Sequence, residues 1–157
     1  MDVPEPLPLT GHPPLAFRFG VFFFAGGGQS NSIDTLFQKV SGIGASVQTA
    51  PVHEGGQNLY LQQLPQAIQH DNLVLERGLV VGSPLALELD AALSLFQFSP
   101  SNVLVSLLDK TSTPVASWLF LNAYPVKWSL SALNATANEV VIKTIELTYQ
   151  SMQPIRF

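Results

Sequence analysis

The chain has 157 residues, of which 46% are hydrophobic and only 11% are charged, with a net charge of −4 and no cysteine. The length fits one domain, the lack of cysteine excludes disulfides and thiolate metal sites, and an acidic chain without a basic run is a poor nucleic-acid binder. Because soluble monomers usually carry about 25% charged residues, the shortage predicts that partners cover part of the surface.

Residues 1–14 contain five prolines and show no apolar periodicity. Proline removes backbone donors and fixes φ, so we expect an extended N-terminal arm here, followed by one β domain over residues 15–157. The acidic, proline-rich start does not resemble a secretion signal. The longest apolar stretch, residues 17–25, is shorter than the ~20 residues that span a bilayer. We therefore expect maturation in the cytoplasm and no membrane insertion.

The first strand is expected at residues 15–24, where Phe17, Phe19, Val21 and Phe23 alternate on one face. A glycine-rich loop follows over residues 25–34 because it offers almost nothing apolar to bury. Further extended segments are predicted by β-rich composition and by flanking turn residues. They lie at residues 36–40, 45–52, 59–64, 72–78, 102–108, 114–122 and 139–150.

One helix is predicted to begin at Ser83 and Pro84, where the serine can cap and the proline can occupy the first helical position. Apolar residues then recur at helical spacing, and the helix should end before Pro100. The recurring residues are Leu85, Leu89, Ala92, Leu93 and Phe96. The sum of elements predicts a mainly β fold, a β-sandwich or β-barrel of about seven strands with one flanking α-helix.

The sequence contains no constellation that predicts catalysis. His12, His53 and His70 are far apart and form no HxxxH or HExxH spacing, so no metal site is expected. Serine is absent from any GxSxG elbow, and the glycines at 26–28 and 42–44 are not followed by the Lys-Ser/Thr pair or the helix of a phosphate loop. We therefore predict no catalytic residue, no cofactor and no enzymatic activity.

Several ordered blocks of the chain resemble the phage tail tube family, which includes the tube proteins of contractile phages and of extracellular contractile injection systems. The resemblance covers about Leu15 to Met152. The blocks are Leu15–Phe19, Phe37–Ile43, His53–Asn58, Leu64–Pro65, Asn72–Gly78, Asn122–Trp128, Leu133–Thr136, Asn138–Val140 and Ile145–Leu147.

The resemblance implies a β-barrel-like subunit of a rigid inner tube, in which homo-hexameric rings stack inside a contractile sheath. Its implied partners are neighbouring rings, the sheath, and baseplate or spike proteins, while cargo or DNA passes through the lumen non-specifically. From the net charge we expect a mostly acidic lumen. The residues expected at the subunit and ring interface are Phe37, Gln38, Lys39, Glu54, Gly55, Gly56, Arg77, Lys127, Trp128 and Asn134.

The proline-rich arm and the long loop at residues 25–34 resemble the tube-initiating paralogues at the baseplate end of such systems. We expect this loop to contact the next layer through Gly26, Gly27, Gly28, Gln29, Ser30 and Asn31. The alternatives are a main shaft protein of a contractile phage tail and a soluble ligand-binding β-sandwich. The tube interpretation implies assembly in the bacterial cytoplasm and a place in a virion tail or a released extracellular particle.

Overall fold

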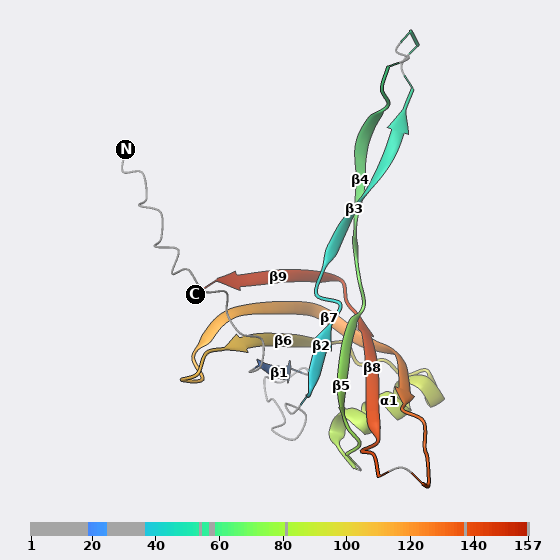
Figure 1. Ribbon diagram of the computed structural model, residues 1–157. Helices are drawn as coiled ribbons and strands as arrows, with labels where there is room; N and C mark the ends of the chain where they lie inside the picture. Colours follow the sequence, from blue (N-terminus) through green and yellow to red (C-terminus); the bar gives the residue numbers. More distant parts are fainter. Residues whose placement is uncertain are drawn as a thin grey trace.

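The computed structural model describes residues 19–24, 37–53, 55–56, 59–80, 82–136 and 138–156, and Figure 1 shows the arrangement. These residues form nine strands and one helix. In chain order the elements are β1 (Phe19–Phe24), β2 (Lys39–Ser41), β3 (Ala45–Val52), β4 (Gln62–His70), β5 (Leu73–Gly78), α1 (Pro84–Leu95), β6 (Ser101–Leu108), β7 (Pro114–Leu130), β8 (Ile142–Thr148) and β9 (Ser151–Arg156).

Seven of the strands form one antiparallel sheet that folds into two layers sharing β7. Layer A consists of β1, β6, the first part of β7 and β9, in that order. Layer B consists of the end of β7, β8, β5 and β2. In Figure 1, β9, β7 and β6 run side by side across the view, whereas β5 and β8 run nearly at right angles to them.

Strand β7 connects the layers because its two halves have different partners. Residues 114–123 pair with β6, and residues 124–130 pair with β8. Between the halves, Asn122 adopts a φ of 52°, in the left-handed region that Asn tolerates better than most residues. A register shift between Pro125 and Lys127 follows directly. The strand therefore changes direction where its partner changes.

The hydrophobic core lies between the two layers and under α1. Strands of both layers alternate buried and partly exposed residues, the pattern of sheets with one face on a core. Layer A contributes Val21, Val103, Val105 and Phe120, layer B contributes Leu73, Leu75, Ile145 and Leu147, and the helix contributes Leu85 and Leu89. The apolar periodicity of the sequence thus marks the core face of each element.

Helix α1 begins at residues suited to a helix start and ends in a left-handed cap. The Ser83 hydroxyl accepts a hydrogen bond from the backbone N–H of Ala86 at 3.2 Å, and Pro84 occupies the first turn. At the other end Phe96 adopts φ 54° and ψ 36°, and the N–H of Gln97 bonds to the carbonyl of Ala91 at 3.2 Å. The helix predicted from Ser83 and Pro84 is confirmed.

Strands β3 and β4 form a separate two-stranded sheet. Figure 1 shows this hairpin projecting away from the rest of the chain as a long arm. Nearly all its residues are exposed, and its extensive contacts are only between its own two strands. A two-stranded hairpin alone is at best marginally stable in water.

The predicted fold class, mainly β with one flanking helix, is confirmed, but some strand limits differ. The segment expected at 59–64 lies at Gln62–His70, with Pro65 inside the strand, because an edge strand tolerates a proline whose nitrogen faces solvent. Residues 139–150 contain β8, and β9 follows it without having been predicted. The expected arm at residues 1–14 and the loop at residues 25–34 lie outside the described residues.

Gly42 provides a test of the packing between layer B and the hairpin arm. Its φ is +80°, and a Cβ there would clash with the carbonyl oxygen of Asn72. We expect Gly42→Ala to destabilise the fold by more than about 2 kcal/mol, because a clash adds to the cost of the left-handed conformation. Gly56→Ala is the control, since Gly56 has a φ of +96° but open space around it. Thermal melting that shifts equally in both variants would contradict this account.

Candidate assembly surfaces

The hairpin arm, defined as residues 45–70, exposes apolar side chains and carries almost no charge. Val47 and Ile68 pair across the strands on one face, and Gln48 donates to Gln69 at 2.7 Å on the other. Near the tip, Leu59 is 91% exposed. Glu54, outside the described residues, is the sole acidic or basic residue of the arm apart from its histidines. An exposed apolar surface of this kind marks a site of protein contact.

The long edges of the arm are unsuited to pairing with a further strand. Pro51 lies in β3 opposite Gln63, and Pro65 lies in β4 opposite Thr49. Since proline has no N–H, it is tolerated in a strand where its nitrogen points away from the partner strand. Each outer edge is therefore interrupted by a proline, which is one way that edge strands avoid unwanted pairing. The prolines therefore limit strand addition to the arm and favour contacts through its side chains.

Layer A, by contrast, has strand edges at β1 and at β9 that pair with no other described strand. Pro154 in β9 pairs with Trp118 of β7, which places its nitrogen on the outer edge. With a period of two, the N–H of Met152 also points outward. The strand directions alternate from β1 through β6 and β7 to β9, so β9 of one copy placed beside β1 of another would again be antiparallel.

The outer face of layer B carries two ion pairs. Lys39 Nζ lies 2.9 Å from Glu76 Oε1, and Lys127 Nζ lies 2.9 Å from Glu146 Oε1. Both lysine side chains are more than half exposed, so each pair contributes at most about 1 kcal/mol to stability. Their effect is to give this face a polar, internally neutralised surface.

A second exposed apolar surface lies where α1 ends. We define the aromatic patch as Phe96, Phe98 and Tyr124, whose rings stack edge to face at centroid distances of 5.1 and 5.5 Å. Phe96 is 85% exposed although its left-handed backbone conformation is unfavourable for an aromatic residue. Exposed aromatic side chains grouped in this way are typical of protein-contact surfaces.

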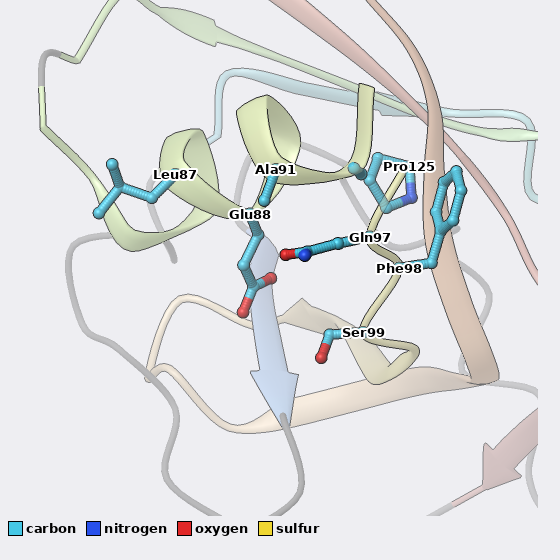
Figure 2. A pocket seen from close by; sticks show the side chains of 8 residues that line it. Leu87, Glu88, Ala91, Gln97, Phe98, Ser99 and Pro125 are labelled. Carbon is cyan, nitrogen blue, oxygen red and sulfur yellow. The ribbon is translucent and has the colours of Figure 1, made fainter. Parts of the chain in front are cut away.

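An open cleft of about 310 Å³ adjoins the aromatic patch. Figure 2 shows Leu87, Glu88 and Ala91 on α1, Gln97 beside Glu88, Ser99 below them, and Phe98 close to Pro125 of β7. The cleft has neither a nucleophile paired with a base nor converging charges. Its composition suits packing against another protein better than chemistry.

Two cations lie inside the chain between layer B and α1. Arg77, 1% exposed, donates from Nη2 to the Ser83 hydroxyl at 2.7 Å, and its guanidinium lies 5.2 Å from the Phe37 ring centroid. Lys143, 7% exposed, places its ammonium 5.2 Å from the centroid of Trp128. Burial lowers the pKa of Lys143, the nearby Asp90 carboxylate opposes this, and Arg77 adds to the lowering.

The structure brings together some of the residues predicted for the interface. Phe37, Gln38 and Lys39 lie beside Arg77 on β5, with the Gln38 N–H donating to the carbonyl of Glu76 at 2.8 Å. Lys127 and Trp128 lie on the opposite edge of the same layer. These residues form parts of layer B, and the buried Arg77 acts within the chain.

The other predicted residues lie elsewhere. Gly55 and Gly56 are exposed between the strands of the hairpin arm, far from layer B in Figure 1. Asn134, between β7 and β8, accepts from the Thr136 backbone N–H at 3.0 Å and from its hydroxyl at 2.7 Å. Glu54 and the loop residues 26–31 lie outside the described residues. Whether any of these residues contacts another copy remains a prediction.

Sequence reasoning missed three features of these surfaces. It did not find the projecting hairpin, the strand edges of β1 and β9, or the aromatic patch. The lack of charge between residues 45 and 70 was the available signal for the first. For the aromatic patch, the signal was the pair Phe96 and Phe98 just beyond a helix end.

We also searched the described ranges for metal sites and for membrane-spanning helices. Those ranges hold no group of three or more His, Asp or Glu side chains placed to bind a metal ion. Within them, no helix reaches the length and apolar character that crossing a membrane requires.

A two-layer β fold with unpaired strand edges and a projecting, nearly uncharged hairpin defines a class of self-assembling β subunits. Residues 15–153 match the family model of the T4-like virus tail tube protein gp19. The chain belongs to this tail tube family, as the sequence blocks indicated. The members are structural tube proteins, which confirms that the chain is not an enzyme.

Solved structures agree with this assignment. A chain of the anti-feeding prophage (AFP) baseplate, determined by cryo-EM with 6-fold symmetrisation, is 34% identical, with a TM-score of 0.84 over 92% of this chain and 97% of that chain. A chain of the sheath–tube complex of the extracellular contractile injection system PVC is 23% identical, with a TM-score of 0.77 over 94% and 95%. An Hcp protein shares the fold at 13% identity and a TM-score of 0.55, over 88% and 99%. No curated protein matches the chain.

The buried Lys143 gives a prediction for pH dependence. Because its pKa is lowered in the folded chain, the unfolded chain holds this proton more tightly, and wild-type stability should rise between the lowered pKa and 10.5. Lys143→Met should therefore raise stability at pH 7 by up to about 1 kcal/mol, and the gain should shrink toward pH 10.5. Thermal melting at several pH values, at fixed protein concentration, measures this.

Lys127→Met is the matched control because Lys127 is exposed. It should change stability by less than about 0.5 kcal/mol at each pH. A constant loss of stability in Lys143→Met across the pH range would show that the ammonium is not penalised by burial.

Proposed function

We propose that this chain is a subunit of the inner tube of a contractile injection system, that six copies close into a ring, and that rings stack into a hollow tube. The single observation that carries the proposal is the pair of strand edges at β1 and β9 on opposite sides of layer A. Unpaired backbone donors and acceptors on an apolar strand are a template for pairing with another chain. Joining β9 to β1 of the next copy satisfies both edges at once.

The geometry of such a ring is reasonable. Neighbouring strands lie about 4.8 Å apart, so the four strands of layer A add roughly 19 Å to the circumference for each copy. If the strands run parallel to the tube axis, six copies would give a ring of strands with a circumference of about 115 Å. Its diameter, measured between backbones, would be about 37 Å. The AFP baseplate chain, similar over nearly its whole length, comes from a structure symmetrised six-fold.

Layer A would face the bore and layer B the outside. Layer B and α1 both lie on the core side of layer A, and they make each subunit broad on that side. Because circumference grows with radius, the joined layer must lie at the smaller radius and the broad side at the larger one. The ion-paired face of layer B, including the predicted Lys39 and Lys127, is then available to sheath or baseplate proteins.

The hairpin arm would contact an adjoining copy through its apolar face. Its Val47 and Ile68 are exposed, and among the described elements β3 and β4 make extensive contacts only with each other. The aromatic patch lies beside α1, at the opposite end of the view in Figure 1 from the tip of the arm. Two different surfaces on one subunit that contact each other between copies give a heterologous contact, which extends an assembly instead of closing a dimer.

We further propose that the chain forms the first, baseplate-proximal tube layer. In support, the AFP baseplate chain is 34% identical, whereas the PVC sheath–tube chain is 23% identical. The loop at residues 26–31 would contact the neighbouring layer or a baseplate protein. Assembly would take place in the bacterial cytoplasm, and the particle would be a released injection system or a virion tail.

A soluble ligand-binding β-sandwich explains the structure less well. Such a module would have no use for a nearly uncharged arm that packs on nothing, and its ligand pocket should be enclosed and carry convergent polar groups. The cleft beside α1 is open and lacks them. The other alternative, a main shaft subunit of a phage tail, differs from the proposed first-layer subunit only in its position along the tube.

A substitution on the outer edge of β9 tests the ring. Met152→Pro should prevent ring formation because it removes an outward N–H at every subunit interface and places a bulky ring at the joint. Each lost hydrogen bond is worth about 1 kcal/mol and recurs around the ring. Met152→Ala loses the same side chain but keeps the N–H, so it should still form rings. Sedimentation velocity and negative-stain microscopy measure the assembly, and circular dichroism verifies the fold.

Rings formed equally well by Met152→Pro and Met152→Ala would overturn the proposed joint. If the Ala variant also failed to assemble, with both variants folded, the side chain of Met152 and not the strand edge would carry the contact.

Adjacent residues of β4 test the hairpin arm. Ile68 and Gln69 are both exposed but point to opposite faces. Ile68→Lys should shorten tubes about tenfold or more, because a lysine would be desolvated in the contact, whereas Gln69→Lys should leave tube length unchanged. Tube length is measured by negative-stain microscopy at equal protein concentration. Equal lengths in both variants would exclude the apolar face as the contact.

A further inference from the structure

The face of layer A that points away from the core carries no charged residue over its described length. Strand register assigns this face, because residues paired directly across neighbouring strands lie on the same side. Two rows illustrate it: Gly20 with Ser106, Ser117 and Ile155, and Phe22 with Leu104, Leu119 and Gln153. The remaining members are Phe24, Asn102, Leu121 and Ser151.

Packing makes this face smooth as well as uncharged. A Cβ on Gly20 would lie 2.8 Å from Cε2 of Phe22, so the Phe22 ring lies over the glycine instead of projecting from the sheet. In the same row, the hydroxyls of Ser106 and Ser117 share a hydrogen bond of 2.8 Å and are both buried. The two hydroxyls are thus bonded to each other, and the Phe22 ring lies against its own strand.

The charged residues of layer A lie outside this face. Asp109 and Lys110 are exposed in the turn between β6 and β7, at one end of the layer. Arg156 pairs with Ala116 in the row that includes Leu107 and Phe19, on the core side. Charges therefore occur at the rim of the face and on its reverse, but not on its surface.

We infer that this uncharged face lines the bore of the ring and contacts a polypeptide cargo whose side chains are largely apolar or uncharged. The inference rests on the ring of the proposed function. It also replaces the mostly acidic lumen expected from the net charge, since none of the described acidic residues lies on this face. Repetition around the ring turns one uncharged face into a continuous neutral wall.

Charge decides which macromolecule the wall suits. Nucleic acid binds proteins mainly by exchanging counterions for Lys and Arg, and this face has neither. Acidic or basic peptides should bind this face poorly, because their charged groups lose hydration on contact and form no ion pair in return. A polypeptide with apolar side chains buries surface against Phe22, Leu104 and Leu119, and its amide groups can bond to Gln153 and Asn102. The contact should also be insensitive to salt.

The test uses assembled rings of the full chain and two fluorescent probes of 20 units each. One is an uncharged peptide of Leu, Ser, Gly and Asn, and the other is a single-stranded oligonucleotide. Co-sedimentation with the rings should retain the peptide at least about tenfold better than the oligonucleotide, at both low and high salt. Gln153→Glu should reduce peptide retention about tenfold, because carboxylates on the wall must be desolvated by an apolar chain. Ser129→Glu is the control, since Ser129 is exposed on the outer face of layer B.

The outcomes separate this inference from the proposed function. Intact rings that retain the oligonucleotide as well as the peptide would overturn the cargo class. Equal retention of the peptide by wild type, Gln153→Glu and Ser129→Glu would show that layer A does not line the bore. Absence of wild-type rings in negative stain would overturn the proposed ring, and the inference with it.

Discussion

The structure poses one constraint: backbone groups on exposed strand edges, and apolar side chains on an arm without extensive contacts to the other described elements, are left without partners in the described part of the chain. Layer A ends in β1 on one side and β9 on the other, and the hairpin arm contacts essentially itself alone. Burial of apolar surface and pairing of backbone donors are the main sources of β-sheet stability. In the proposed ring, neighbouring copies supply a part of both. The low charge content follows, because surfaces that will be covered have no need of solvation.

Much of the fold could be predicted from local pattern. Period-two alternation of Phe17, Phe19, Val21 and Phe23 gave the first strand, and Ser83 with Pro84 gave the start of the only helix in the described residues. These signals are strong because both the strand face and the helix cap are decided by residues close in sequence. The family resemblance then implied a β-barrel-like subunit, but the order and pairing of the strands, which short-range pattern does not contain, were not predicted.

The candidate surfaces were harder to predict because they arise from pairings between distant residues. Nothing near Ser106 shows that it will share a hydrogen bond with Ser117 and lie in a row with Gly20 and Ile155. The predicted interface residues followed the recognisable blocks instead. One of them, Arg77, is conspicuous in sequence but is buried by the cap of α1 and by Phe37. A charged residue in a strand can serve the core as readily as an interface, and sequence alone does not distinguish the two.

Self-assembly also requires that wrong contacts be avoided. In the described part of the chain, different residues disfavour such contacts on different surfaces. Proline interrupts both edges of the hairpin arm, which leaves its apolar face free to bind while preventing strand addition. Paired lysines and glutamates cover the outer face of layer B and disfavour apolar association there. In layer A the edges of β1 and β9 lie on opposite sides, and the outer edge of β9 keeps the N–H of Met152 beside Pro154. The distribution of proline and charge therefore limits which exposed β edges can pair, as the proposed ring requires.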